Sequence, residues 1–313
     1  MRAVRASGGN VELVDVPAPT AGDRVRVRVR SAGICGSDLH LVAGGAPIGH
    51  TLGHEIAGTA PDGTPVAIEP LLPCGGCARC LEGDYNLCAR GPAIVIGIAS
   101  DGGMAEEIAV PERCLVPLPA GVRVEDACLV EPLAVAIHGL RRAALRGGER
   151  VAVVGGGSIG LCAVAALRAA GAHVDLVARH DAQHEAGARL GAGADVGDGY
   201  DLVVDAAGSR SALAQAVGLC RAGGRLLLLA TYWEGFELPG FPLCLKEVDV
   251  IPASLYARHG VARDVDVAAG TLAANPEIAR AMITHRFPLD GAVEAFDTAA
   301  RRSAGAVKVV LEP

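Results

Sequence analysis

The spacing of apolar and polar residues changes near residue 145 and divides this chain into two differently patterned regions. Over 24–30, valine and arginine alternate, which predicts a strand with one apolar and one solvated face. The region before 145 otherwise contains short strands and loops. Beyond it, apolar runs alternate with helical stretches: we expect strands at 149–154, 174–178, 202–204 and 225–230, and helices at 158–170 and 211–220. This alternation predicts an α/β fold with a parallel sheet covered on both faces.

The last part of the chain has a third pattern. Residues 279–287 are predicted to be helical, and 306–311 to form a closing strand. At 313 residues, the chain exceeds the roughly 250 residues at which single cores stop growing. We therefore predict two domains.

A glycine fingerprint lies between the first apolar strand of the second region and the helix after it. The segment reads Gly155-Gly156-Gly157-Ser158-Ile159-Gly160. Gly155 permits a tight turn, Gly157 permits close approach of a pyrophosphate, and Gly160 permits close helix–strand packing. The amide groups at the helix N-terminus, including those of Ser158 and Ile159, favour phosphate. This context predicts a dinucleotide site, and a glycine-rich turn of another α/β fold is the alternative.

The choice of dinucleotide depends on the end of the next strand, about twenty residues after the glycine turn. NAD requires an acidic residue there, whereas arginine favours the 2′-phosphate of NADP. Arg179 takes that place, because Asp175 comes too early and Asp181 slightly late. We predict NADP(H) over NAD(H), with a solvated charge at the start of a helix as the other explanation of Arg179.

Four cysteines with the spacing C-x2-C-x2-C-x7-C form the strongest chemical signal: Cys74, Cys77, Cys80 and Cys88. The set exceeds what a redox pair needs, and Pro73, Gly75 and Gly76 allow the tight turns of a metal knuckle. Four thiolates complete a tetrahedral zinc site and leave no position for substrate. This site is predicted to be structural.

A second, incomplete set of metal ligands precedes it. Cys35 lies in Ile34-Cys35-Gly36-Ser37-Asp38, and His54 in Gly53-His54-Glu55. A catalytic zinc needs about three protein ligands and one exchangeable position. Two carboxylates compete for the third place, Glu55 and the Glu131 of Glu131-Pro132-Leu133, and the sequence leaves both open.

With these motifs, the chain resembles the zinc-containing medium-chain dehydrogenases/reductases, in particular the polyol and threonine dehydrogenase branch. The resemblance covers nearly the whole chain and implies a GroES-like catalytic domain plus a Rossmann cofactor domain. It divides the chain into 1–145, which includes the zinc lobe at 70–91, a cofactor domain at 146–275, and a return segment at 276–313 that completes the catalytic domain.

The resemblance also implies roles for single residues. Cys35 and His54 correspond to catalytic zinc ligands, and Glu131 stands where alcohol dehydrogenases carry a third cysteine ligand. In the polyol branch, Glu55 can ligate directly while the glutamate at 131 holds a zinc-bound water. Asp38 corresponds to the residue that orients the zinc-binding histidine.

Further residues are expected along the path of the proton and around the cofactor. Ser37 corresponds to the hydroxyl that receives the alcohol proton, and His40 to the outer end of a relay. Leu255 is expected to border the nicotinamide, and Ala207 follows an apolar strand of the cofactor domain. The segment 56–66 is shorter than in relatives, so no specific substrate carries over.

The predicted function is therefore a zinc-dependent transfer of hydride between a nicotinamide cofactor and a secondary alcohol or polyol, or the matching ketone. A biosynthetic cyclitol or amino-sugar dehydrogenase is the alternative within enzymes, and a non-catalytic redox sensor the alternative outside them. Relatives suggest a homodimer or homotetramer.

Composition excludes several other classes of protein. A net charge of −7 and 3% aromatic residues argue against nucleic-acid and membrane-surface partners. The first five residues contain no apolar signal segment, and the cysteines are spaced for metal rather than for a disulfide framework. We therefore predict a cytoplasmic location.

Overall fold

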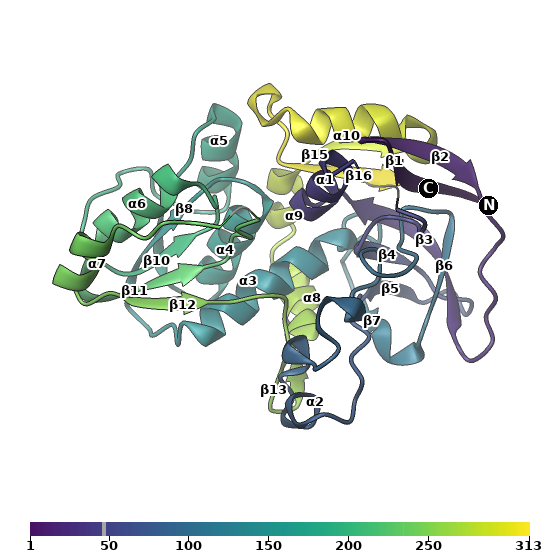
Figure 1. Ribbon diagram of the computed structural model, residues 1–313, viewed down its shortest axis with the longest axis horizontal. Coiled ribbons are helices and arrows are strands. Elements are labelled where there is room, and N and C mark those ends of the chain that lie inside the picture. Colours follow the sequence, from purple (N-terminus) through teal and green to yellow (C-terminus); the bar gives the residue numbers. More distant parts are fainter. Residues whose placement is uncertain (46–47, 234) are drawn as a thin grey trace. The chain divides into compact units, whose positions relative to one another are not determined.

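The computed structural model describes residues 1–45, 48–233 and 235–313 (Figure 1). The chain folds into two compact units, each treated separately below. The first comprises Met1–Glu131, Ala257–Ala279 and Ile283–Pro313, and the second Pro132–Tyr256 with Arg280–Met282.

A seven-stranded sheet forms the centre of the first unit. Its order is β15 (Ile283–Pro288), β16 (Lys308–Glu312), β3 (Val25–Gly33), β4 (Glu55–Thr59), β5 (Pro65–Ile68) and β7 (Leu115–Pro117), while β6 (Glu107–Val110) pairs with β3. The predicted alternation is present in β3, where Val27 and Val29 are buried and Arg26 and Arg28 are exposed. The strand runs on to Gly33, so its end leads directly to Cys35.

Short elements surround this sheet. They are β1 (Arg2–Ser7), β2 (Asn10–Asp15), α1 (Gly36–Ala43), α2 (Ala78–Glu82), β13 (Arg258–His259), β14 (Ala262–Arg263), α8 (Asp264–Ala274) and α10 (Ala292–Ala300). Single 3₁₀ turns occur at Tyr85–Leu87, Gly91–Ile94, Glu112–Cys114, Ala127–Leu129, Leu289–Gly291 and Arg302–Ala304. In Figure 1, α10 lies along β15 and β16, against which it packs.

The second unit is a parallel sheet with helices. Its strands are ordered β12 (Asp249–Pro252), β11 (Cys220–Leu228), β10 (Tyr200–Asp205), β8 (Arg150–Val154) and β9 (His173–Val177). The helices are α3 (Val130–Arg142), whose first two residues belong to the first unit, α4 (Ser158–Ala169), α5 (Asp181–Arg189), α6 (Arg210–Leu219) and α7 (Gly240–Leu245). Val151–Val153 and Leu202–Val204 are fully buried, as expected for a sheet covered on both faces.

Sequence order along this sheet reverses between β8 and β10. The neighbour of β8 on one side is β9, the next strand in the chain, and on the other side it is β10. Ligands of open α/β sheets bind outside the carboxyl ends of the strands at such a switch point. The glycine turn that follows β8 therefore occupies the binding position of the fold.

The structure corrects one expectation for the tail. The predicted helix 279–287 is α9 (Glu277–Met282) followed by the strand β15. Alternate residues of β15 are partly buried, and the strand pairs in parallel with β16. The preceding helix and the aromatic residue at 287 made the segment resemble one amphipathic helix, whereas the sheet partner decides its conformation.

The division into units also differs from the expected boundaries at 145 and 275. The first unit ends at Glu131, in the first turn of α3, so the helical pattern runs across the boundary without a break. Residues 257–279 belong to the first unit, because α8 packs against β7 and against the 3₁₀ turn at 127–129.

Candidate catalytic, metal and cofactor sites

Three potential metal ligands converge at the open end of the β3–β4 pair. Ligand atoms of Cys35, His54 and Glu55 all lie within 4.8 Å of one another. Cys35 caps the N-terminus of α1, and Glu55 begins β4 directly opposite Gly33. A Cβ at position 33 would lie 2.1 Å from Glu55 Oε2, so glycine is required there for this carboxylate to fit.

Asp38 and Ser37 surround the imidazole of His54. Asp38 Oδ1 lies 3.5 Å from His54 Nδ1, and Asp38 Oδ2 accepts a 2.9 Å hydrogen bond from the Cys35 amide. Ser37 Oγ lies 3.3 Å from His54 Nε2. Burial lowers the pKa of His54, but Asp38 and Cys35 more than reverse this, so the pKa lies well above its ordinary value. This negative environment suits a divalent cation, and Asp38 fits the carboxylate that orients a metal-bound histidine.

Lys308, on β16, holds the Glu55 carboxylate. Its ammonium donates to both carboxylate oxygens, at 2.7 and 2.6 Å, and to the Ile34 carbonyl at 3.2 Å. Both side chains are only 1% exposed. Burial lowers the pKa of Lys308, but the Glu55 charge, with Cys35 and Cys128, raises it above its ordinary value. Lys308 belongs to none of the motifs, although a lysine within the apolar run of 306–311 was a signal for a buried ion pair.

The remaining predicted residues of this site, Glu131 and His40, lie outside the converging set. Among the described residues, that set contains no Glu131, which is buried in the first turn of α3. His40 is exposed and lies one turn after Ser37 on α1. The structure therefore places Cys35, His54 and Glu55 together and leaves the role of Glu131 as a prediction.

The four-cysteine motif forms a second cluster in the first unit, around α2. Ligand atoms of all four cysteines lie within 4.8 Å of one another. The Sγ of Cys80 lies 3.4 Å from that of Cys77 and 3.8 Å from that of Cys74, while the Cys74 amide donates to Cys88 Sγ at 3.3 Å. A single tetrahedral ion can be enclosed by such a set.

The protein backbone favours thiolates within this cluster. Amide hydrogen bonds from Ala89 and Cys80 lower the pKa of Cys77 to about 6. Burial and the neighbouring thiols raise the pKa of Cys80 to about 12. Because a metal binds thiolates, the low pKa of Cys77 gives the ion a ligand that is already deprotonated at neutral pH.

The glycine turn after β8 has the geometry of a phosphate-binding loop. Gly155 has a φ of +113°, and a Cβ at position 160 would lie 1.8 Å from the Gly155 carbonyl oxygen. Gly157 caps α4, and the buried Ser158 hydroxyl has no hydrogen-bond partner in the described part of the chain. A bound phosphate would supply that partner and receive the free amide groups of the helix.

The turn after β10 lies directly beside the glycine turn, and Asp205 holds it in place. A Cβ on Gly155 would lie 2.7 Å from the amide nitrogen of Ala207. The fully buried Asp205 accepts hydrogen bonds from the amides of Ala207 and Gly208, at 2.9 and 3.3 Å, and from the Tyr232 hydroxyl at 2.5 Å. Ala207 was expected from the sequence, whereas Asp205 and Tyr232 were not, because their association depends on the fold.

Arg179 lies in the turn between β9 and α5. It is exposed, and its amide donates to Gln183 Oε1 at 3.3 Å. A Cβ on Gly156 would lie 2.6 Å from Gln183 Cβ, so this turn packs against the glycine turn. Asp175 lies inside β9, and its carboxylate accepts a 2.8 Å hydrogen bond from the Tyr200 hydroxyl. This carboxylate is therefore already engaged within the fold. Leu255 follows β12 in a left-handed conformation with φ +57°.

Comparisons with known proteins place the chain in a family. Residues 21–120 match the alcohol dehydrogenase GroES-like domain, and residues 158–269 match the zinc-binding dehydrogenase model. L-galactonate-5-dehydrogenase of Escherichia coli is 30% identical over 90% of this chain and 89% of its own length. Sorbitol dehydrogenase of Bombyx mori is 30% identical over 99% and 97%.

A solved structure agrees with this. Galactitol-1-phosphate dehydrogenase from Escherichia coli covers 100% of both chains with a TM-score of 0.88 and 28% identity. The chain belongs to the zinc-containing medium-chain dehydrogenases/reductases, within the polyol dehydrogenase branch, as its motifs predicted. It has the fold of that family, a GroES-like domain with a Rossmann domain, and is an NAD(P)-dependent alcohol or polyol oxidoreductase. No helix in the described residues is long and apolar enough to span a bilayer.

Proposed function

We propose that this protein oxidises a secondary alcohol of a polyol, or reduces the matching ketone, at a zinc held by Cys35 and His54. The convergence of Cys35, His54 and the Ser37 hydroxyl at the end of β3 carries this proposal. When bound, zinc supplies a Lewis acid that lowers the pKa of an oxygen ligand. Each remaining step belongs to residues of the chain.

Ser37 and His40 are proposed to move the proton. The Ser37 hydroxyl lies 3.3 Å from His54 Nε2 and could accept the proton of a substrate alcohol. His40 is exposed one helical turn further on and can pass that proton to water. Asp38 is a positioning residue, because it faces His54 Nδ1 and leaves Nε2 for the metal.

We propose that Glu55 stays with Lys308 and that Glu131 completes the catalytic site, as a ligand or through a bound water. Two hydrogen bonds of 2.6–2.7 Å in a fully buried setting must be broken before Glu55 can turn to a metal. Breaking such a pair leaves an uncompensated buried charge. The four-cysteine cluster would hold a second, structural zinc, since it offers no open position.

The nicotinamide cofactor is proposed to be NADP(H). Its pyrophosphate would bind at Gly155–Gly160, and its 2′-phosphate at Arg179. Arg179 is exposed and belongs to the turn that packs on Gly156. Asp175 accepts a hydrogen bond from Tyr200, so we do not expect it to bind the ribose as an acidic residue.

Arg179→Asp is expected to lower kcat/KM for NADP⁺ by roughly 10- to 100-fold, because a charge-assisted contact to the 2′-phosphate is lost and a repulsive charge is added. The kcat/KM for NAD⁺ should stay the same or rise. Arg189→Asp, at the other end of α5, makes the same charge change and should preserve the cofactor ratio. An unchanged ratio in the Arg179 variant would remove this residue from cofactor choice.

The protein is proposed to act as a homodimer or homotetramer in the cytoplasm. The edge strand β12 and the neighbouring residues of α7 supply a possible contact, with Phe241 80% and Leu245 70% exposed. All ten cysteines are free, which suits a reducing compartment.

The proposed function is tested by following nicotinamide absorbance with secondary alcohols, polyols and cyclitols, supplying NADP⁺ and NAD⁺ separately. Turnover that a zinc chelator removes and added zinc restores supports it. A lack of turnover across the panel, with protein that carries two zinc ions per chain, would contradict a general polyol specificity and favour a cyclitol or amino-sugar substrate outside the panel.

Arg302 favours a narrower candidate, a sugar acid or sugar phosphate. Its Nη2 lies 3.8 Å from where a Cβ on Gly36 would lie, so the exposed guanidinium is next to the residue between Cys35 and Ser37. A carboxylate or phosphate on the substrate could pair with it. Arg302→Gln should then raise KM for anionic polyols by about tenfold and leave neutral polyols unchanged, whereas Arg301→Gln should alter neither. Equal effects on both substrate types would refute this candidate.

A further inference from the structure

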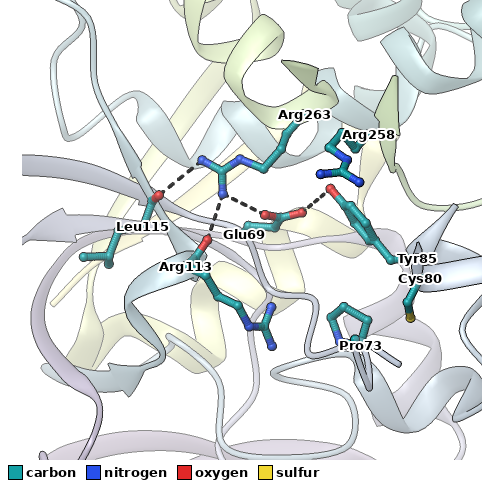
Figure 2. A pocket seen from close by; sticks show the side chains of 9 residues that line it. Glu69, Pro73, Cys80, Tyr85, Arg113, Leu115, Arg258 and Arg263 are labelled. Atoms are coloured by element: carbon teal, nitrogen blue, oxygen red, sulfur yellow. Dashed lines mark hydrogen bonds and ion pairs between the residues drawn. The ribbon is translucent and has the colours of Figure 1, made fainter. Parts of the chain in front are cut away.

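A pocket of about 490 Å³ opens in the first unit beside the four-cysteine cluster. The described residues that line it do not include Cys35 or His54. Glu69, Tyr85, Arg113, Arg258 and Arg263 contribute its polar lining, and Pro73 and Leu115 contribute apolar wall (Figure 2). These residues come from the position directly after β5, from the lobe at 70–91, from the start of β7 with the turn before it, and from the β13–β14 hairpin. The volume suits a small ligand.

The only carboxylate lining the pocket, among the described residues, is already neutralised. Glu69 accepts from the Tyr85 hydroxyl at 2.6 Å and from Arg263 at 3.0 Å. Arg263 also binds Asp266 and the carbonyls of Arg113 and Leu115. This network is internally satisfied and leaves no need for a ligand of its own.

Two other guanidinium groups are not neutralised by it. Arg113 donates through Nη1 to the Leu71 carbonyl at 3.2 Å, a neutral acceptor, and forms no ion pair with a carboxylate among the described residues. Arg258 packs its side chain against Gly83 of the α2 turn, with Nε 3.5 Å from where a Cβ would lie. Figure 2 shows the two on either side of the Glu69–Tyr85 pair, with both lining the same hollow.

We infer that this pocket binds a phosphate dianion, either free or as the phosphate of a small monoester. Guanidinium groups present planar forks of donors that match phosphate oxygens. The chain as a whole carries a net charge of −7 and does not attract anions. The binding free energy of an anion here would therefore come from local contacts to Arg113 and Arg258. Pro73, Leu115 and the ring of Tyr85 provide surface for the carbon part of a monoester.

A second explanation makes a different prediction. Cys80 also lines the pocket, and four thiolates around a divalent ion carry a formal charge of about −2. The two arginines could serve only to balance that charge. In that case, their removal would weaken metal retention, and wild-type protein would bind no phosphate.

The test uses zinc-loaded protein saturated with NADPH, which fills the cofactor site and prevents oxidation of glycerol phosphate. Arg302→Gln is titrated alongside, because an anion bound beside Gly36 would lose affinity in that variant. Inorganic phosphate, glycerol phosphate and acetate are titrated separately by calorimetry, and zinc content is measured after dialysis. We expect one phosphate site per chain, with acetate at least about tenfold weaker, and loss of phosphate affinity of about tenfold in Arg113→Gln and in Arg258→Gln. Arg79→Gln is the matched control, because Arg79 lies on α2 and pairs with Glu82 without lining the pocket.

Tighter binding of glycerol phosphate than of inorganic phosphate would identify a monoester as the ligand, and the reverse order free phosphate. Absence of a phosphate site in the wild type would overturn the inference. Phosphate binding that survives in the double variant Arg113→Gln/Arg258→Gln would also overturn it. Early zinc loss in the two variants, with no phosphate binding by wild type, would establish charge balance as their role.

Discussion

Cys35→Ser is expected to lower kcat/KM by about three orders of magnitude while the four-cysteine cluster keeps its zinc. Serine is not an anionic ligand at neutral pH, so the Cys35–His54 site loses a thiolate donor. A Lewis acid is worth several kcal/mol to the transition state, and about 1.4 kcal/mol corresponds to a factor of ten in rate. His54 and the proposed Glu131 remain, but two ligands from the chain are too few to retain the metal.

Kinetics and metal content measured on the same sample check this prediction. Wild-type protein should carry two zinc ions per chain, Cys35→Ser one, and Cys77→Ser one, with the catalytic ion retained in the last case. Cys244→Ser is the control, because Cys244 is exposed on α7 and lies outside both clusters. Turnover near the wild-type level in Cys35→Ser would contradict its role as a ligand.

Lys308→Met is expected to destabilise the first unit by about 3–5 kcal/mol, because the substitution leaves Glu55 as a buried, unpaired carboxylate. For a unit of this size, the melting temperature should fall by roughly 10 °C. The double variant Glu55→Leu/Lys308→Met should regain most of the loss, because replacement of both partners by apolar groups removes the charge as well.

Thermal unfolding by circular dichroism, on zinc-loaded samples, measures this effect. Lys246 is the only other lysine in the chain and supplies the control. It donates to carbonyls at the end of α6 and is less buried, so Lys246→Met should cost less. If Lys308→Met fails to fold, recovery of folding in Glu55→Leu/Lys308→Met still identifies the unpaired Glu55 carboxylate as the cause. A single variant as stable as wild type would show that the pair contributes little.

Much of the second unit could be predicted because its signals are local. Residues 151–154 and 202–204 are buried on both faces of the sheet, so both strands appear in the sequence as uninterrupted apolar runs. The glycine turn could also be predicted from the sequence. The Gly155 carbonyl oxygen approaches position 160 so closely that only glycine fits there. Residues 283–288 were misread because their strand conformation comes from pairing with β16, a partner about 25 residues away.

The sequence by itself determined the family, and it predicted both candidate sets of metal ligands and the glycine turn, because spacing along the chain is sufficient where residues lie on one turn or one strand end. The tertiary structure alone decided that Lys308 holds Glu55, that Asp205 and Tyr232 support the turn beside Gly155, and that two arginines from distant segments face one pocket. These groups are 27 to 253 residues apart or come from separate elements. Their contacts exist only after the chain has folded, so no local pattern encodes them.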